Sequence, residues 1–218
     1  MPSWDMHTKI VAESFTLAPV TRSPNPRSWY IGDTTVLGQP YAARSRRPAD
    51  APADTLPLGE HLAKELGPDT WRHLDAVHEA AHAVLYAASG VGVDHILLRD
   101  PPASSRVQCV PGPFRIGDAL ITMAAGSVAS VRRLRELGLW TEWRGHLAEC
   151  TDHEDRQAIV RLASEHGFTV TLDGYGDLLD AAEAALAARW GVVLRLADAV
   201  VSAGRLGRGE VAALVEGG

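Results

Sequence analysis

Apolar residues recur every three or four positions through most of the chain after residue 57, which is the spacing of one face of a helix. The pattern is clearest between Asp69 and Gly90. Its apolar positions are Trp71, Leu74, Val77, Ala81, Val84 and Leu85. Asp69 is a residue type favoured at a helix N-cap, and glycine is favoured just after a helix end. We therefore predict one long helix between Asp69 and Ser89-Gly90.

The same patterning predicts further elements along the chain. Further helices are expected over Leu58 to Leu66, Ile116 to Leu137, Thr151 to His166, Leu178 to Ala203 and, as a turn or two, Leu206 to Leu214. Val91 to Leu98 alternates and is rich in Val, Ile and Leu, which predicts a strand, and a loop or second strand is expected around Val107 to Val110. Trp140 to Cys150 and Gly174-Tyr175-Gly176 are interpreted as irregular or turn segments. The fold class predicted is mainly α with a small β element (α+β).

Residues 1–56 lack this periodicity and are predicted to form an irregular arm or linker ahead of a domain that spans residues 57–218. Ile31 to Val36 could form a short strand or hairpin edge. An arm that carries Trp29 and Tyr30 could dock on the catalytic part of the chain or on a second subunit in a homo-oligomer. A disordered tail is an equal alternative.

The predicted long helix contains His-Glu-x-x-His at residues 78–82. His78 and His82 are four residues apart, so both imidazoles can bind one metal ion, while Glu79 can reach a water attached to that ion. A solvent-facing helix could carry the same residues by chance. The apolar and alanine neighbours instead favour partly buried histidines, which need hydrogen-bond partners or a metal. The motif indicates a zinc hydrolase.

Composition excludes several other classes. The 218 residues are 46% hydrophobic, enough for one sizeable core, and the net charge of −6 gives no reason to expect a nucleic-acid partner. Neither a signal peptide nor a membrane span is apparent, so a soluble cytoplasmic protein is expected. Cys109 and Cys150 lack C-x-x-C spacing and are interpreted as two buried thiols.

From about Asp69 to Leu214 the order of elements resembles the peptidase part of the FtsH-type ATP-dependent zinc metalloproteases. Ala76 to Ala83 resembles the family's A-[YV]-H-E-A-G-H-A, with Ala81 where glycine is usual. Ala124 to Ala129 resembles its small-residue G-x-x-A-E segment, with Ser130 in place of the glutamate. These small residues permit close approach of another helix, for which the motif helix is the candidate. The resemblance implies a zincin-like helical bundle with the motif on a central helix.

The resemblance also implies a third zinc ligand, an aspartate near the start of a later helix. Matching the apolar positions of that helix favours Asp152. Glu154 and Asp155 stay open, because helix starts are located only to within about 2–4 residues. A simpler interpretation is that these acids favour the helix N-terminus through its dipole.

No G-x-x-x-x-G-K-[ST] segment is present, so ATP-driven unfolding is not expected of this chain. We expect an ATP-independent zinc metallopeptidase or amide hydrolase, with Glu79 as the base and Zn²⁺ held by His78, His82 and Asp152. A peptide or flexible protein segment is the expected substrate, held by edge pairing along the strand from His95 to Leu98. Candidates for assisting the oxyanion are His95, His146, His166 and Tyr175.

Two alternatives remain at this stage. The chain could be a non-proteolytic zinc-binding scaffold or partner-binding protein that keeps the peptidase fold. A fourth protein ligand such as His153 or His146 would favour that interpretation, because structural zinc sites are closed. It could also be a specialised tailoring hydrolase in a biosynthetic pathway.

Overall fold

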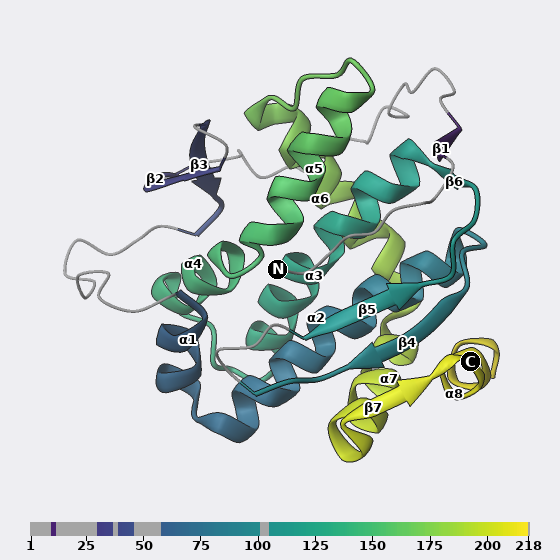
Figure 1. Ribbon diagram of the computed structural model, residues 1–218. Helices are drawn as coiled ribbons and strands as arrows, with labels where there is room; N and C mark the ends of the chain where they lie inside the picture. Colours follow the sequence, from purple (N-terminus) through teal and green to yellow (C-terminus); the bar gives the residue numbers. More distant parts are fainter. Residues whose placement is uncertain (1–9, 12–29, 37–38, 46–57, 101–104, 218) are drawn as a thin grey trace.

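The computed structural model describes residues 10–11, 30–36, 39–45, 58–100 and 105–217, and these are mainly helical with a small antiparallel sheet (Figure 1). This confirms the α+β class. The helices are α1 (Leu58–Leu66), α2 (Pro68–Ala88), α3 (Ile116–Glu136), α4 (Glu142–Cys150), α5 (His153–Glu165), α6 (Leu172–Ala187), α7 (Trp190–Ala203) and α8 (Arg208–Glu216). The strands are β1 (Ile10–Val11), β2 (Tyr30–Val36), β3 (Gln39–Ala43), β4 (Val93–Leu97), β5 (Arg106–Cys109), β6 (Phe114–Arg115) and β7 (Arg205–Gly207). In these described parts of the chain, no helix combines the length and the apolar character required to cross a membrane.

Two helices, α2 and α3, form the centre of the core. Helix α2 packs against α3 and α7, and α3 also packs against α5 and α6. The residues at the centre are small and fully buried: Ala76, Ala80, Ala81 and Ala83 on α2, and Ala124 and Ala125 on α3. Small side chains let two helix backbones approach closely, as the sequence predicted for these segments. The motif on α2 therefore lies directly against α3.

A three-stranded antiparallel sheet in the order β5-β4-β7 packs against α2. The predicted strand from Val91 to Leu98 is confirmed as β4, but β4 is the central strand, paired on one side with β5 and on the other with β7. The expectation that His95 to Leu98 offers an edge for a peptide is therefore wrong. Strand β7 was not predicted. It is three residues long and follows Gly204, whose φ of 73° ends α7 and turns the chain back onto β4.

The start of α2 and the segment that contains α4 differ from the prediction. Helix α2 begins at Pro68 with Gly67 as N-cap, so Asp69 lies in the first turn and is not the cap. The segment from Trp140 to Cys150 contains α4, which starts where Thr141 Oγ1 accepts a hydrogen bond from the Arg144 backbone N–H. Gly145 lies in the middle of this segment, and glycine has a low helix propensity, so the sequence did not predict a helix here.

The predicted helix from Leu178 to Ala203 is two helices. Helix α6 starts earlier, at Leu172, because Thr171 caps it by accepting the Gly174 N–H, so the expected turn at Gly174 to Gly176 is helical. The helix then breaks at Ala188 and Arg189. Helix α6 packs on α3 whereas α7 packs on α2, so the chain has to change direction between them.

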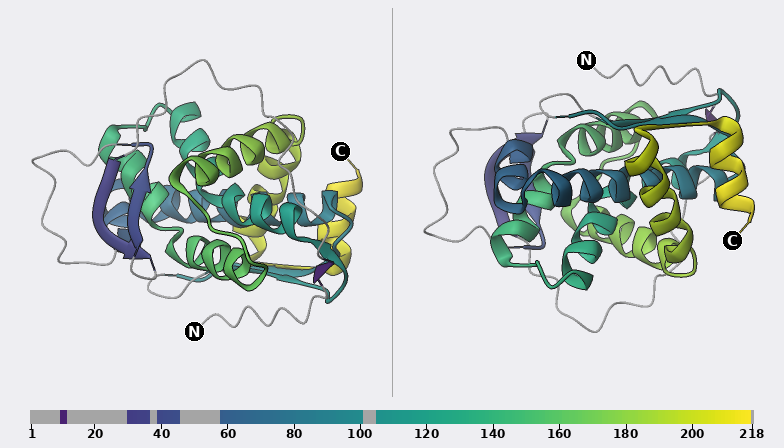
Figure 2. Two further views of the ribbon diagram at one scale, coloured as in Figure 1. Left: turned by 90° about the horizontal axis from the view of Figure 1, so that it is seen from above. Right: turned by 90° about the horizontal axis from the view of Figure 1, so that it is seen from below.

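Residues 10–11, 30–36 and 39–43 of the predicted arm form strands. Strand β1 pairs in parallel with β6, and β2 pairs with β3 as an antiparallel hairpin, in line with the hairpin edge expected at Ile31 to Val36. Figure 2 shows β2 and β3 at one side of the molecule, with α8 near the opposite side. Strand β2 contacts α5, and β3 contacts α4. Trp29 lies outside the described residues.

Candidate metal centre

Three side chains from two helices converge in the interior. His78 and His82 come from α2, and Asp155 comes from the first turn of α5. His78 Nε2 lies 3.1 Å from Asp155 Oδ2, His82 Nε2 lies 3.1 Å from the same oxygen, and the two Nε2 atoms are 3.0 Å apart. His82 and Asp155 are buried and His78 is partly exposed. Among the described residues, these three make up the group that could hold a metal ion.

The donor triangle fits a small divalent metal ion such as zinc. With bonds of about 2.0–2.1 Å, the donors of a tetrahedral zinc site lie about 3.3 Å apart. The observed separations of 3.0 and 3.1 Å are close to that value, so one ion can touch all three atoms from one side of their plane. Two imidazoles and a carboxylate are also a donor set that suits zinc. Three protein ligands leave the fourth position for water or substrate, as in catalytic zinc sites.

Helix α3 fixes the tautomer of His82. The Nδ1–H of His82 donates to the backbone carbonyl of Thr122, with 2.7 Å between the two atoms. In the neutral ring the lone pair then lies on Nε2, which is the atom that faces His78 and Asp155. Such a hydrogen bond to the far nitrogen is the usual outer support of a metal-bound histidine.

Helix α3 also makes room for His78. A Cβ atom placed on Gly126 would lie 2.3 Å from Cε1, 2.4 Å from Nε2 and 2.6 Å from Nδ1 of His78. These distances are far below van der Waals contact, so the His78 ring occupies space that any side chain at position 126 would need. Gly126 in the small-residue segment therefore makes the space that the His78 ring occupies.

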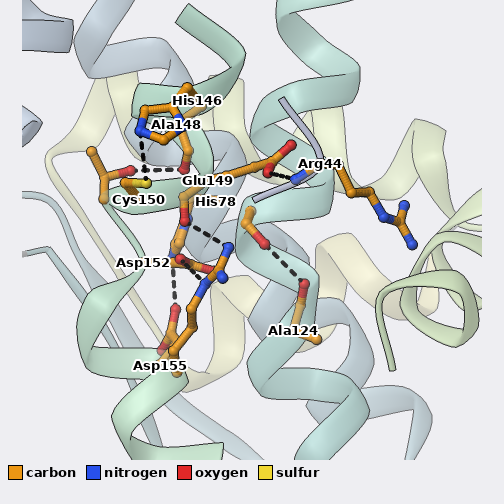
Figure 3. A network of polar contacts seen from close by, with 12 residues as sticks. Arg44, His78, Ala124, His146, Ala148, Glu149, Cys150, Asp152 and Asp155 are labelled. Atoms are coloured by element: carbon orange, nitrogen blue, oxygen red, sulfur yellow. Dashed lines mark hydrogen bonds and ion pairs between the residues drawn. The ribbon is translucent and has the colours of Figure 1, made fainter. Parts of the chain in front are cut away.

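The third member of the group is Asp155, one of the alternatives left open by the sequence, and not Asp152. Asp152 is buried as the N-cap of α5, and its Oδ1 accepts a hydrogen bond of 2.9 Å from Arg156 Nε. Glu154 is exposed. Figure 3 shows Asp152 at this helix start and Asp155 about one turn further along, with His78 nearby. The assignment depends on where the helix begins, which the apolar pattern locates only within a few residues.

The group is strongly coupled electrostatically. Burial lowers the pKa of His78, but the hydrogen bond and the charge of Asp155 more than offset this and raise it to about 9. Burial likewise lowers the pKa of His82, and Asp155 again reverses the shift and raises it. Burial raises the pKa of Asp155, but His82 and His78 hold it well below its usual range. In the metal-free protein the charge of Asp155 is therefore balanced by protons on the histidines, and a metal ion bound to the three donors can take their place.

Glu79 is buried beside this group. Burial raises its pKa to about 7, the charges of His78 and His82 lower it, and those of Asp75 and Asp155 raise it. A carboxyl group that titrates near neutral pH suits proton transfer. Asp75, which sequence reasoning missed, is one turn before Glu79 on the same helix face. Its carboxylate accepts a hydrogen bond from Ser105 Oγ next to β5; the only signal for it is the i, i+4 spacing to Glu79.

The other candidate residues have different partners. His95 contacts Asp94, His146 Nδ1 donates to the Ser45 carbonyl, and His166 caps the end of α5. The Tyr175 ring lies under the Arg156 guanidinium, with 4.6 Å between the guanidinium carbon and the ring centroid. His153 Nε2 contacts Gln157. Neither His146 nor His153 joins the group of three ligands.

Replacing Gly126 by alanine should weaken zinc binding. The new methyl group displaces the His78 ring, and we expect the zinc affinity to fall by about ten-fold or more, as for changes that disturb a ligand's support. Gly209→Ala on α8 is the matched control, because a Cβ there meets nothing within 4 Å. Competition against a chromophoric chelator measures both affinities. Unchanged affinity in Gly126→Ala would contradict this role for His78.

The zinc-free protein should lose stability as pH rises. The folded-state pKa of His78 is about 9 against an ordinary value of 6.5, so the stability from its pairing with Asp155 is fully present below 6.5 and is lost as pH rises through 9. We expect the melting temperature without metal to fall from pH 6.5 to 9, with a shallower slope in Asp155→Asn. Added zinc displaces these protons, so the increment that zinc adds should grow over the same range. A metal-free melting temperature that rises over this range would contradict the coupling.

Known proteins add no assignment to this geometry. Comparisons with protein-family models, with curated proteins and with solved structures found no match.

Proposed function

We propose that this protein is a zinc-dependent metallopeptidase or amide hydrolase that works without ATP. The observation that carries the proposal is the donor triangle of His78, His82 and Asp155, with buried Glu79 adjacent to it on α2. The resemblance to the FtsH-type peptidases supports it, because an aspartate near the start of a later helix is the third ligand which that family uses. Asp155, in the first turn of α5, fits that description.

Each residue has a distinct part in this chemistry. His78, His82 and Asp155 would hold the ion. Zinc bound there would supply a water whose pKa is lowered to about 7 and would polarise the carbonyl group that is attacked. Glu79 takes the proton of the attacking water and later gives it to the departing amine. Because burial raises its pKa to about 7, Glu79 can both accept and release a proton near neutral pH.

Strand β5 offers the edge that an extended substrate needs. Among the described strands, β5 pairs only with β4, so its other side is an edge of the sheet. The Val110 N–H donates to the Gly92 carbonyl next to β4, and backbone groups alternate along a strand, so those of Val107 and Cys109 point toward this edge. Ser105, which precedes β5, is hydrogen-bonded to Asp75 on the motif helix. We propose that a peptide pairs with β5 and thereby lies along α2.

The arrangement favours an enzyme over a zinc-binding scaffold. A structural zinc site would be closed by a fourth protein ligand. His146 and His153, the two candidates that the sequence offered for this position, are engaged with Ser45 and Gln157. A scaffold would also have no use for a buried carboxyl group at Glu79. A tailoring hydrolase would use the same residues on a different amide.

Substitutions at the site separate the ligands from the base. Asp155→Asn should abolish tight zinc binding and activity, whereas Glu154→Gln, an exposed acid in the same helical turn, should keep both. Asp152→Asn should weaken zinc binding less than Asp155→Asn, because Asp152 acts on Arg156 and not on the ion. Elemental analysis after gel filtration measures the zinc content. Zinc retained in full by Asp155→Asn would exclude this ligand set.

Glu79→Gln should keep about one zinc per chain and lose turnover by about 100-fold or more, the contribution expected from a general base. Turnover is followed by mass spectrometry of new termini in a mixture of unstructured peptides incubated with the zinc-loaded protein. The Glu154→Gln protein serves as the active control. Activity that survives Glu79→Gln would contradict the proposed mechanism. A zinc-loaded wild-type protein that cleaves none of these peptides would favour the zinc-binding scaffold.

A further inference from the structure

Residues 44–45 of the N-terminal arm are bound to α4 by one buried carboxylate. Glu149 Oε2 accepts the backbone N–H groups of Arg44 and Ser45, the latter at 3.3 Å, and Glu149 Oε1 accepts the Ser45 hydroxyl at 2.9 Å. Glu149 and Ser45 are both buried. Figure 3 shows Glu149 reaching toward Arg44 from the helix that also carries His146. More than one hundred residues separate the two sides of this contact.

Two further contacts hold the same two residues. The Ser45 carbonyl accepts a hydrogen bond of 3.1 Å from His146 Nδ1, and a Cβ atom on Gly145 would lie 2.5 Å from Ser45 Oγ, so the glycine makes room for the serine. The Arg44 guanidinium donates to the Gly176 carbonyl and forms an ion pair with Asp180, both on α6. Residues 44–45 thus fasten α4 to α6, and we call them the arm anchor.

The anchored part of α4 leads directly to the third metal ligand. Helix α4 ends one residue after Glu149, and a short corner connects it to α5, which carries Asp155. Arg156 braces this corner: its Nη2 donates to the Glu149 carbonyl at 2.9 Å and its Nε to Asp152 Oδ1 at 2.9 Å. The Arg156 guanidinium also covers the ring of Tyr175 on α6, next to the residue whose carbonyl binds Arg44. Arg156 is the immediate neighbour of Asp155.

We propose that the arm anchor positions the α4–α5 corner, and that Glu149 and Ser45 are positioning residues for the metal ligand Asp155. The inference rests on the proposed metal centre. A buried carboxylate needs hydrogen-bond donors, and residues 44–45 supply three to Glu149, so this contact helps to hold Glu149 and the corner attached to it in place. Asp155 must meet two histidines fixed on α2, and a small displacement of α5 would open the donor triangle. Residues 44–45 of the arm therefore help to position the metal ligand Asp155.

The test compares full-length variants with a matched control. Glu149→Ala removes both acceptor atoms of the contact. Ser45→Ala removes only the hydroxyl donor and leaves the two backbone contacts. This milder variant can still be tested if Glu149→Ala does not fold. Glu210→Ala is the control, since Glu210 also accepts a backbone N–H, that of Gly207 at 2.8 Å, on the exposed helix α8. Three readouts are taken: zinc affinity, the visible spectrum of the Co²⁺-loaded protein, which reports coordination geometry, and hydrogen exchange of α5 amides in the metal-free protein.

We expect Glu149→Ala to lower zinc affinity by about ten-fold or more, the range seen for outer supports of metal ligands, and Ser45→Ala to lower it less. Both should alter the Co²⁺ spectrum and speed hydrogen exchange in α5, while Glu210→Ala changes none of these. Wild-type affinity and an unaltered spectrum in folded Glu149→Ala or Ser45→Ala would overturn the inference and leave the metal centre standing. If the wild type binds no zinc, the proposed function is wrong, and hydrogen exchange of the α5 amides alone tests the anchoring. Faster exchange in Glu149→Ala or Ser45→Ala would then support anchoring of the corner, and unchanged exchange would overturn it.

Discussion

The close approach of α2 to α3 at Gly126 is the constraint on which the site depends. The His78 ring fills the space where a side chain at position 126 would be, and the same helix α3 supplies the Thr122 carbonyl that orients His82. Both imidazoles are therefore held by one neighbouring helix. The alanines around them, Ala80 and Ala83 on α2 and Ala124 and Ala125 on α3, bury apolar surface without keeping the backbones apart. The close packing of α2 against α3 is therefore also what places the two imidazole rings.

The buried charges of the site explain why it holds a positive charge, as protons or as a metal ion. Asp155 brings a buried negative charge against two histidine nitrogens, and buried Glu79 adds a second carboxyl group on the same helix as the histidines. A buried carboxylate without a compensating charge is costly, so the site holds protons or a metal ion. Burial lowers the pKa of His78, but the hydrogen bond and the charge of Asp155 raise it to about 9, so the metal-free site holds a proton there near neutral pH. A divalent ion can replace that proton while leaving Glu79 available as a base.

The parts of this account that sequence could predict are those fixed by local spacing. His78, Glu79 and His82 lie within five residues of one helix, so their relative placement follows from helical geometry. The choice among Asp152, Glu154 and Asp155 does not, because it depends on where α5 begins. That start is set by the bracing of the corner by Arg156 and by contacts with residues 44–45, more than a hundred positions away. Strand β7 and helix α4 were missed for the same reason: β7 exists through its pairing with β4, and the glycine within α4 makes room for Ser45.

X-ray absorption at the zinc edge of the zinc-loaded wild-type protein tests the central claim most directly, since it reports the atoms bound to the ion and their distances. The account predicts one zinc with two imidazole nitrogens and oxygen donors at about 2.0–2.1 Å, from His78, His82, Asp155 and a water. A sulfur ligand, a third imidazole, or an ion surrounded only by exchangeable waters would contradict it.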